Sequence, residues 1–290
     1  MSHTKCLYHA KVSLVLGCLI FSLVGLLLPV SALAADLDSA TTIDSSAVGQ
    51  IASSPEFAVE FPSSGAIGFD VSYPQCQASL TSNPPASTTA YQFAVIGITG
   101  GRAMTRNRCL GAEYQVAAGQ GLPISFYLNV NYPRGAAVAY GQDGPLGTCD
   151  NFDEQCISYT YGWNTAQAAY QNAQQTLQSL NVSDMPSIWW LDVEIANYWS
   201  PDPSLNDRVI QGAIDFFQQS VGNVTVGIYS VRSDWNRIAG ASFQPGVPAW
   251  VAGARSLNGA GQLCAQPSFT GGPVALVQYA NKQFDVDYVC

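Results

Sequence analysis

The sequence predicts an α/β protein built on a single (β/α) barrel of the TIM type, irregular in its details. Two observations carry this prediction. Apolar runs with strand character alternate with helical patterns along most of the chain. Several of these runs also end on polar or acidic residues, and the catalytic groups of such barrels lie at the carboxyl ends of the strands. A doubly wound open sheet is the second choice, but no glycine-rich phosphate-binding fingerprint follows any strand.

The predicted strands are short apolar runs bounded by turn residues. Seven of them are clear and an eighth closes the chain: residues 66–72, 93–99, 123–130, 187–194, 224–230, 248–253, 274–280 and 284–289. Three helical patterns lie between them, at residues 108–121, 165–180 and 204–222. The last of these has apolar residues at helical spacing, from Val209 to Val221.

The N-terminus has the features of a secretory signal. Lys5 and Lys11 precede an apolar run that ends near Val30, and Ala32-Leu33-Ala34 is a typical cleavage site. We therefore predict a signal peptide over residues 1–34 and no stable membrane anchor after its removal. Residues 35–64 are rich in Ser, Ala and Thr and predict a flexible tether or propeptide, so the barrel is expected over residues 65–290.

Composition excludes several classes of function. Cleavage would leave nine basic and 20 acidic side chains and a formal charge of −11, because Lys5 and Lys11 are lost from the 11 basic residues and no acidic residue is. Such a chain lacks the basic surface that nucleic acids require. Both histidines, His3 and His9, lie in the signal, which excludes histidine-dependent nucleophiles and histidine-bound metals. Acid-base chemistry would therefore rest on Asp and Glu, with no cofactor and no metal expected.

The cysteine count indicates disulfides. Of the eight cysteines, Cys6 and Cys18 belong to the signal, and an even number in an exported chain is typical of disulfide pairing. Cys149 and Cys156 bracket a short loop and are expected to pair. Order along the chain suggests Cys76–Cys109 and Cys264–Cys290 for the rest, although six cysteines allow 15 connectivities.

One strand carries two carboxylates in a chain that is only 11% charged. In the segment SIWWLDVE, Asp192 and Glu194 are two positions apart, so both side chains leave the same face of the strand. Buried carboxylates are costly unless they are paired or used in chemistry. A paired structural feature is the alternative, but a catalytic pair is favoured because Asp70 ends the first strand in a similar context.

Polar residues at the ends of other strands extend this candidate site. They are Asn129, Tyr229 and Gln278, joined by Tyr127 in the third strand and by Asp285 in the last. Aromatic residues beside carboxylates suit the apolar faces of sugar rings. For any single aromatic residue, however, packing in the core is the more common role.

Six segments resemble the lysozymes of glycoside hydrolase family 25, in the right order from about Gly65 to the C-terminus. They are GAIGFDVSYPQ, FAVIGITGG, WWLDVE, VTVGIYS with the following Trp235, PAWVAGA and LVQYANKQFDVDYV. The resemblance implies an irregular (β/α) barrel and cleavage of the bond after N-acetylmuramic acid in peptidoglycan. It also implies four acidic site residues, which fall here on Asp70, Asp192, Glu194 and Asp285, with Asp287 as a rival for the last.

The expected function is therefore that of a secreted, extracellular glycoside hydrolase, monomeric and able to associate with a cell wall. Glu194 would be the general acid and Asp192 its assistant, while Asp70, Asp285, Tyr127, Asn129, Tyr229 and Gln278 would bind the polysaccharide.

Departures from the family pattern keep two alternatives open. Thr99-Gly100-Gly101 stands where many family members carry an acid, and residues 141–156 form an acidic insertion expected near the mouth of the barrel. The alternatives are a non-catalytic carbohydrate-binding protein on the same barrel and a glycosidase for a different polysaccharide.

Overall fold

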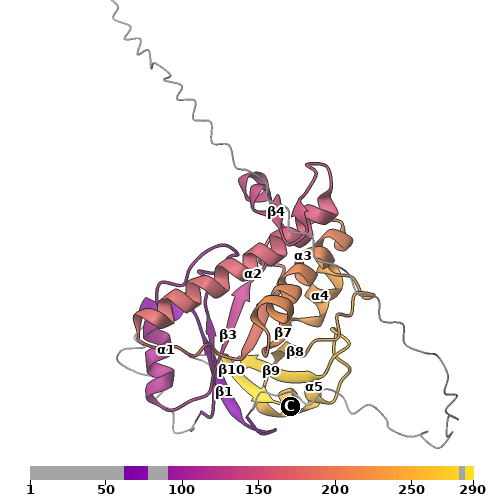
Figure 1. Cartoon of the computed structure of the whole chain (residues 1–290). Helices are drawn as coiled ribbons and strands as arrows, with labels where there is room; N and C mark the ends of the chain where they lie inside the picture. Colours follow the sequence, from indigo (N-terminus) through magenta and orange to yellow (C-terminus); the bar gives the residue numbers. More distant parts are fainter. Residues whose placement is uncertain (1–61, 78–90, 281–284) are drawn as a thin grey trace, which may run out of the picture. The chain divides into compact units, whose positions relative to one another are not determined.

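The computed structural model describes residues 62–77, 91–280 and 285–290 (Figure 1). The predicted signal peptide lies outside these residues, as does the predicted tether except for its last three positions. Among the described residues, no helix is both long and apolar enough to cross a membrane.

Eight strands close into a barrel, which confirms the predicted fold. Around the barrel the order is β1-β10-β9-β8-β7-β6-β3-β2. The strands are β1 (Ile67–Val71), β2 (Ala94–Gly97), β3 (Ile124–Asn129), β6 (Ile188–Asp192), β7 (Thr225–Ser230), β8 (Ala249–Ala254), β9 (Val274–Ala280) and β10 (Asp285–Val289). Neighbouring strands are parallel except around β10, which runs antiparallel to both β9 and β1.

The antiparallel β10 is the main irregularity of the barrel. Only residues 281–284 connect β9 to β10. A parallel neighbour needs a crossover of a dozen or more residues, so a connection this short can only return the chain antiparallel. On its other side, β10 pairs with β1. The register of these two strands places Asp285 opposite Asp70 and Asp287 opposite Gly68.

Helices follow most of the strands, as the alternation predicted. They are α1 (Leu110–Gly119), α2 (Glu154–Ser179), α3 (Pro203–Phe216), α4 (Arg232–Ile238) and α5 (Leu257–Cys264), and a π-helical turn, Phe217–Val221, continues α3. The last two helices were not predicted, because elements this short give little periodicity to read. Helix α2 starts well before the predicted residue 165, since the Asp153 side chain caps it by accepting from Cys156 N.

Helices α2 and α3 pack with their backbones in close contact. A Cβ atom on Gly162 of α2 would collide with the carbonyl oxygen of Val209, and one on Gly212 of α3 with that of Tyr159. The two glycines therefore permit this close approach, and larger residues at either position would force the helices apart.

The two tryptophans of β6 point to opposite faces of the sheet and pack in two different parts of the core. Trp189 points outward and packs against Phe126 and Phe217, between the barrel and the helices. Trp190 points into the barrel, where its ring centroid lies 5.7 Å from that of Trp250. Because side chains alternate along a strand, Asp192 shares the inward face with Trp190. The strand thus carries its carboxylate toward the inside of the barrel.

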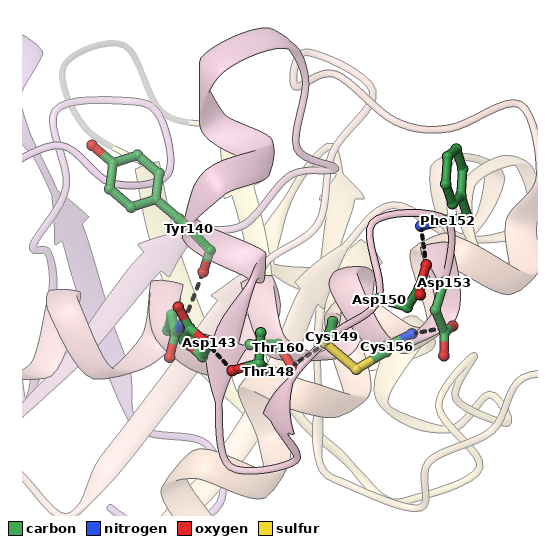
Figure 2. The surroundings of a disulfide bond; sticks show 10 residues. Tyr140, Asp143, Thr148, Cys149, Asp150, Phe152, Asp153, Cys156 and Thr160 are labelled. Atoms are coloured by element: carbon green, nitrogen blue, oxygen red, sulfur yellow. Dashed lines mark hydrogen bonds between the residues drawn. A yellow bond between two sulfur atoms is a disulfide. The ribbon is translucent and has the colours of Figure 1, made fainter.

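The acidic insertion lies between β3 and α2. A 3-10 helix (Gly135–Gly141) leads into it, and it contains a small hairpin of β4 (Asp143–Gly144) and β5 (Gly147–Thr148). Figure 2 shows how Cys149 and Cys156 join the end of this hairpin to the first turn of α2, with Phe152 directed away from the disulfide. Phe152 is 93% exposed.

The other disulfides join Cys76 to Cys109 and Cys264 to Cys290, so all three are the pairs expected from order along the chain. The first holds a short 3-10 helix, Tyr73–Gln77, against the start of α1. The second attaches the end of α5 to the last residue of the chain, directly after β10.

Candidate active site

A pocket of about 240 Å³ opens where the strands of the barrel end. Every predicted site residue except Asn129 lines it, and Asn129 lies just behind. Four of its lining residues were not among the predicted site residues: Ser72, Pro74, Gln75 and Trp250. The first three follow β1 in the segment that the Cys76–Cys109 disulfide holds, and their proximity to the carboxylates depends on that tertiary contact.

Asp192 is held deep in the pocket by a chain of hydrogen bonds. The Asn129 side chain donates from Nδ2 to Asp192 Oδ2. Thr99 Oγ1 in turn donates to Asn129 Oδ1 over 2.6 Å, and Asn129 N donates to Thr99 Oγ1 over 3.2 Å. All three residues are buried, and Asp192 is only 5% exposed. Thr99 and Asn129 therefore fix the orientation of one carboxyl group and have no acid-base role of their own.

Asp192 and Glu194 form a coupled pair in which both pKa values are raised. Burial is the largest cause for each. Within the pair the effects are opposite: the Glu194 carboxylate raises the pKa of Asp192, and a hydrogen bond with Asp192 lowers that of Glu194. The titrations of the two carboxyl groups are therefore linked, and burial favours the protonated form of each. The charge of Asp234, on α4, raises the pKa of Glu194 further.

Asp70 faces this pair from the other side of the pocket. Its pKa is raised to about 7, chiefly by burial, and the charges of Asp285 and Glu194 add to the rise. Gln278 Nε2 donates to Asp70 Oδ2 over 2.8 Å and partly offsets it. Tyr229 Oη donates to Gln278 Oε1, also over 2.8 Å. Gln278 thus connects a carboxylate of β1 with a tyrosine of β7.

The two acids of β10 lie in different places. Asp285 has an exposed side chain and lines the pocket, and its pKa is raised by partial burial. Asp287 is completely buried inside the barrel, where Trp250 Nε1 donates to its Oδ1 over 2.8 Å. Burial raises the pKa of Asp287 well above its usual range. Of the two rivals in the sequence, Asp285 is the one that borders the pocket.

Aromatic rings form the floor of the pocket around Trp250. The ring centroid of Tyr229 lies 4.5 Å from that of Trp250, and the centroid of Tyr127 lies 6.0 Å from it. Trp250 is 1% exposed, so it serves mainly as packing under the two tyrosines. Burial, followed by the charge of Asp70, raises the pKa of Tyr127, which keeps its hydroxyl protonated.

No group of three or more His, Cys, Asp or Glu residues is arranged to hold a metal ion in the part of the chain that the structure describes. The carboxyl groups of the pocket can instead donate and accept protons, and its hydroxyl and amide groups can bind a polar ligand.

Fold and pocket together define a (β/α)-barrel protein with carboxyl groups gathered at the carboxyl ends of its parallel strands, the position of the active site in barrels of this type. A family model described as "Lysozyme-like protein 1" matches residues 155–267. That segment includes Asp192 and Glu194 and extends from the start of α2 to beyond α5. The match confirms the resemblance to lysozymes that the sequence motifs indicated.

Solved structures of similar proteins include three lysozymes or muramidases. A family GH25 lysozyme from Aspergillus fumigatus is 18% identical with a TM-score of 0.47, over 78% of this chain and 93% of that one. A muramidase from Trichobolus zukalii is 16% identical with a TM-score of 0.48, over the same shares. The bacterial lysozyme from Streptomyces coelicolor is 17% identical with a TM-score of 0.45, over 79% and 93%. No curated protein sequence matches the chain significantly.

Proposed function

We propose that this protein is a secreted glycoside hydrolase of the lysozyme type that cleaves a cell-wall polysaccharide, with peptidoglycan as the first substrate to test. One observation carries the proposal: Asp192, Glu194, Asp70 and Asp285 all line one pocket. Hydrolysis of a glycosidic bond needs a protonated carboxyl group and a second group that stabilises the positive charge of the transition state. The partial match to a lysozyme-like family model supports the same class of reaction.

Glu194 is the better candidate for the proton donor. It is partly exposed in the pocket, whereas Asp192 is buried and held by Asn129. A general acid must reach the glycosidic oxygen, and of these two residues Glu194 is the one open to a substrate. The pKa of Glu194 is raised, chiefly by burial, which favours the protonated form that a general acid needs.

The remaining groups would serve the charged intermediate. As Glu194 gives up its proton, the leaving sugar departs with the bonding electrons, and the ring carbon left behind becomes positive. Asp192 would then stabilise this charge directly, or orient an acetamido group of the sugar that attacks the carbon. Asp70 and Asp285 would bind hydroxyl groups or the water molecule that completes hydrolysis. Tyr127, Tyr229 and Gln278 would position the sugar ring.

The three disulfides support the predicted secretion, because such bonds persist in oxidising compartments outside the cytosol. A cell-wall substrate would be met in the same place. The signal peptide itself remains a prediction from the sequence.

The test is incubation of the secreted protein with purified peptidoglycan and with a panel of other polysaccharides, followed by mass spectrometry of the products. We expect soluble fragments with a new reducing end from peptidoglycan. Glu194→Gln should lower the rate by about 10²–10⁴-fold, the usual contribution of a general acid. Glu113→Gln is a matched control, since Glu113 is a buried carboxyl group outside the pocket that also has a raised pKa.

Two results would replace this proposal with one of its alternatives. Cleavage of another polysaccharide, with peptidoglycan left intact, would identify a glycosidase of different specificity. Binding of glycans without cleavage of any would identify a carbohydrate-binding protein on a glycosidase-like barrel. Full activity in Glu194→Gln would show that another group donates the proton.

A further inference from the structure

A second pocket is lined by residues that directly follow Glu194 in the chain. It is larger than the pocket that contains the four carboxyl groups, which is called the acidic pocket below. The volume of the second pocket is about 540 Å³, and most of its lining comes from the loop between β6 and α3, where Ile195, Asn197, Tyr198 and Trp199 lie. The other wall comes from α4 and includes Arg237. None of the proposed catalytic residues lines it.

The loop that lines the second pocket is hydrogen-bonded to the backbone of Glu194 and to helix α4. Asn197 N and Trp199 Nε1 both donate to the carbonyl oxygen of Glu194, over 3.1 Å and 2.8 Å. Asp234 of α4 accepts from Ile195 N over 3.3 Å, and its charge also raises the pKa of Glu194 in the acidic pocket. The candidate proton donor, which lines the acidic pocket, therefore directly precedes the loop that lines the second pocket.

The second pocket is held in shape by buried groups. Asn206, a completely buried residue of α3, donates from Nδ2 to the carbonyl oxygens of Ser200 and Ile238 and accepts from Ser200 N. Tyr132 N donates to the carbonyl oxygen of Tyr198 over 2.9 Å. The Arg134 guanidinium lies 4.8 Å from the centre of the Tyr198 ring, which orients that ring. A loop tied down at so many points is already formed before any ligand binds, and this lowers the cost of binding.

The lining has the chemistry of a sugar site. Tyr198 is 42% exposed and Ile195 is 51% exposed, so an aromatic ring and an aliphatic side chain are both open to solvent. Asn197 and Arg237 stand beside them as hydrogen-bond donors. Apolar surface combined with a few placed polar groups is typical of small-molecule sites, and it matches a sugar, which has apolar ring faces and polar edges.

We infer that the second pocket is an extended subsite that binds the part of the same glycan strand that continues past Glu194. The inference rests on the proposed function and deepens it by naming a long, polymeric substrate. A sugar unit stacks on Tyr198 and Ile195, while Asn197 and Arg237 bind its hydroxyl, acetamido or carboxylate groups. The acidic pocket, at about 240 Å³, holds the unit that reacts.

Isothermal titration calorimetry tests this, with the Glu194→Gln variant preventing turnover. The ligands are peptide-free oligosaccharides of alternating N-acetylglucosamine and N-acetylmuramic acid, as disaccharides and as hexasaccharides. We expect the hexasaccharide to bind more tightly than the disaccharide. Adding Tyr198→Ala should weaken hexasaccharide binding about tenfold, which corresponds to about 1.4 kcal/mol. The disaccharide should lose much less.

Two further variants complete the test: one is a second change in the pocket, and the other is a control outside it. Arg237→Ala changes an exposed side chain, so it should reduce hexasaccharide affinity without any effect on the melting temperature. Phe152→Ala removes an aromatic ring that is 93% exposed and lines neither pocket, and it should leave the preference for the hexasaccharide intact. The inference is overturned if Tyr198→Ala and Arg237→Ala both keep hexasaccharide affinity within twofold of the parent. The inference is also overturned if tight binding is found only with oligosaccharides that still carry the peptide of peptidoglycan.

Failure of the subsite and failure of the proposed function can be told apart. If the wild-type protein cleaves peptidoglycan but Tyr198→Ala keeps the preference for long chains, only the subsite is wrong. If the wild-type protein cleaves nothing, yet Tyr198→Ala abolishes that preference, the subsite stands and the hydrolase assignment fails.

Discussion

Gln278 Nε2 donates a hydrogen bond of 2.8 Å to Asp70 Oδ2, between residues that are 208 positions apart in the chain. Their strands, β9 and β1, are not neighbours in the barrel, because β10 lies between them. The contact therefore reaches across the inside of the pocket. It stabilises the charged form of Asp70 against the burial that raises its pKa to about 7.

Removing this contact should raise the pKa of Asp70 further. In Gln278→Ala the carboxylate would lose the one hydrogen bond that favours its charged form, while burial and the charges of Asp285 and Glu194 would remain. Carbon-13 NMR of labelled aspartate, followed against pH, should show the Asp70 midpoint above about 7. Gln175→Ala, an exposed glutamine on α2, is the control. An unchanged or lower midpoint in Gln278→Ala would contradict the structural assignment.

The pH dependence of activity should follow the coupled pair. With no histidine among residues 35–290, carboxyl groups are expected to set the profile, and its alkaline limb should mark loss of the Glu194 proton. Asp192→Asn removes one of the two like charges, so the remaining carboxyl group releases its proton more easily. The alkaline limb should then move to lower pH, with a lower maximal rate. A limb that stays in place would mean that a different group controls it.

The protein should be more stable in mild acid than at neutral pH. Asp70, Glu113 and Asp207 each have a pKa raised to about 7, mainly by burial. Their folded-state pKa values are above the unfolded values, so the folded state binds more protons over this range. Stability then falls as pH rises from about 4 to about 7. Urea unfolding at several pH values measures this directly.

Glu113 allows the contribution of one group to be isolated. It is 1% exposed, and Asn107 Nδ2 donates to its Oε2 over 2.7 Å. Glu113→Gln keeps an acceptor for Asn107 but cannot ionise, so the loss of stability between pH 5 and pH 8 should become smaller. Each unit of pKa difference is worth about 1.4 kcal/mol. An identical pH dependence in the variant would show that Glu113 titrates normally.

The Cys264–Cys290 disulfide should stabilise the last strand. The two cysteines are 26 positions apart, and the entropy that such a bond removes from the unfolded state predicts a contribution of about 3.5 kcal/mol. Replacing both cysteines by serine should therefore lower the urea midpoint. Hydrogen exchange should show the loss of protection centred on β10, which carries Asp285. Equal exchange across the whole barrel would argue against a local role for this bond.

Cysteine oxidation can be checked independently. Intact-mass measurement after alkylation under non-reducing conditions should find no free thiol in the secreted protein, because all six cysteines after the predicted signal are paired. Labelling of Cys149 or Cys156 in particular would contradict both the sequence prediction and the structure.

Local patterns in the sequence were sufficient for the barrel and for the candidate catalytic pair. Alternation of apolar strands and helices indicated the fold, and spacing by two within SIWWLDVE placed Asp192 and Glu194 on one face. These features depend on neighbouring residues, whose geometry the backbone sets directly. The same patterns missed α4 and α5, which are too short to show a period, and they placed the start of α2 too late.

Only the tertiary structure decided which polar groups meet. Asn129 and Asp192 both lie in predicted strands, but their hydrogen bond depends on the parallel register of β3 and β6, which pairs these two positions. Which of Asp285 and Asp287 borders the pocket depends on the antiparallel direction of β10. Its first residue, Asp285, lies at the pocket, and Asp287 is buried against Trp250. The second pocket likewise needs the loop after β6 and the helix α4 together. Contacts between segments far apart in the chain arise from packing and register, and these have no local signature in the order of the amino acids.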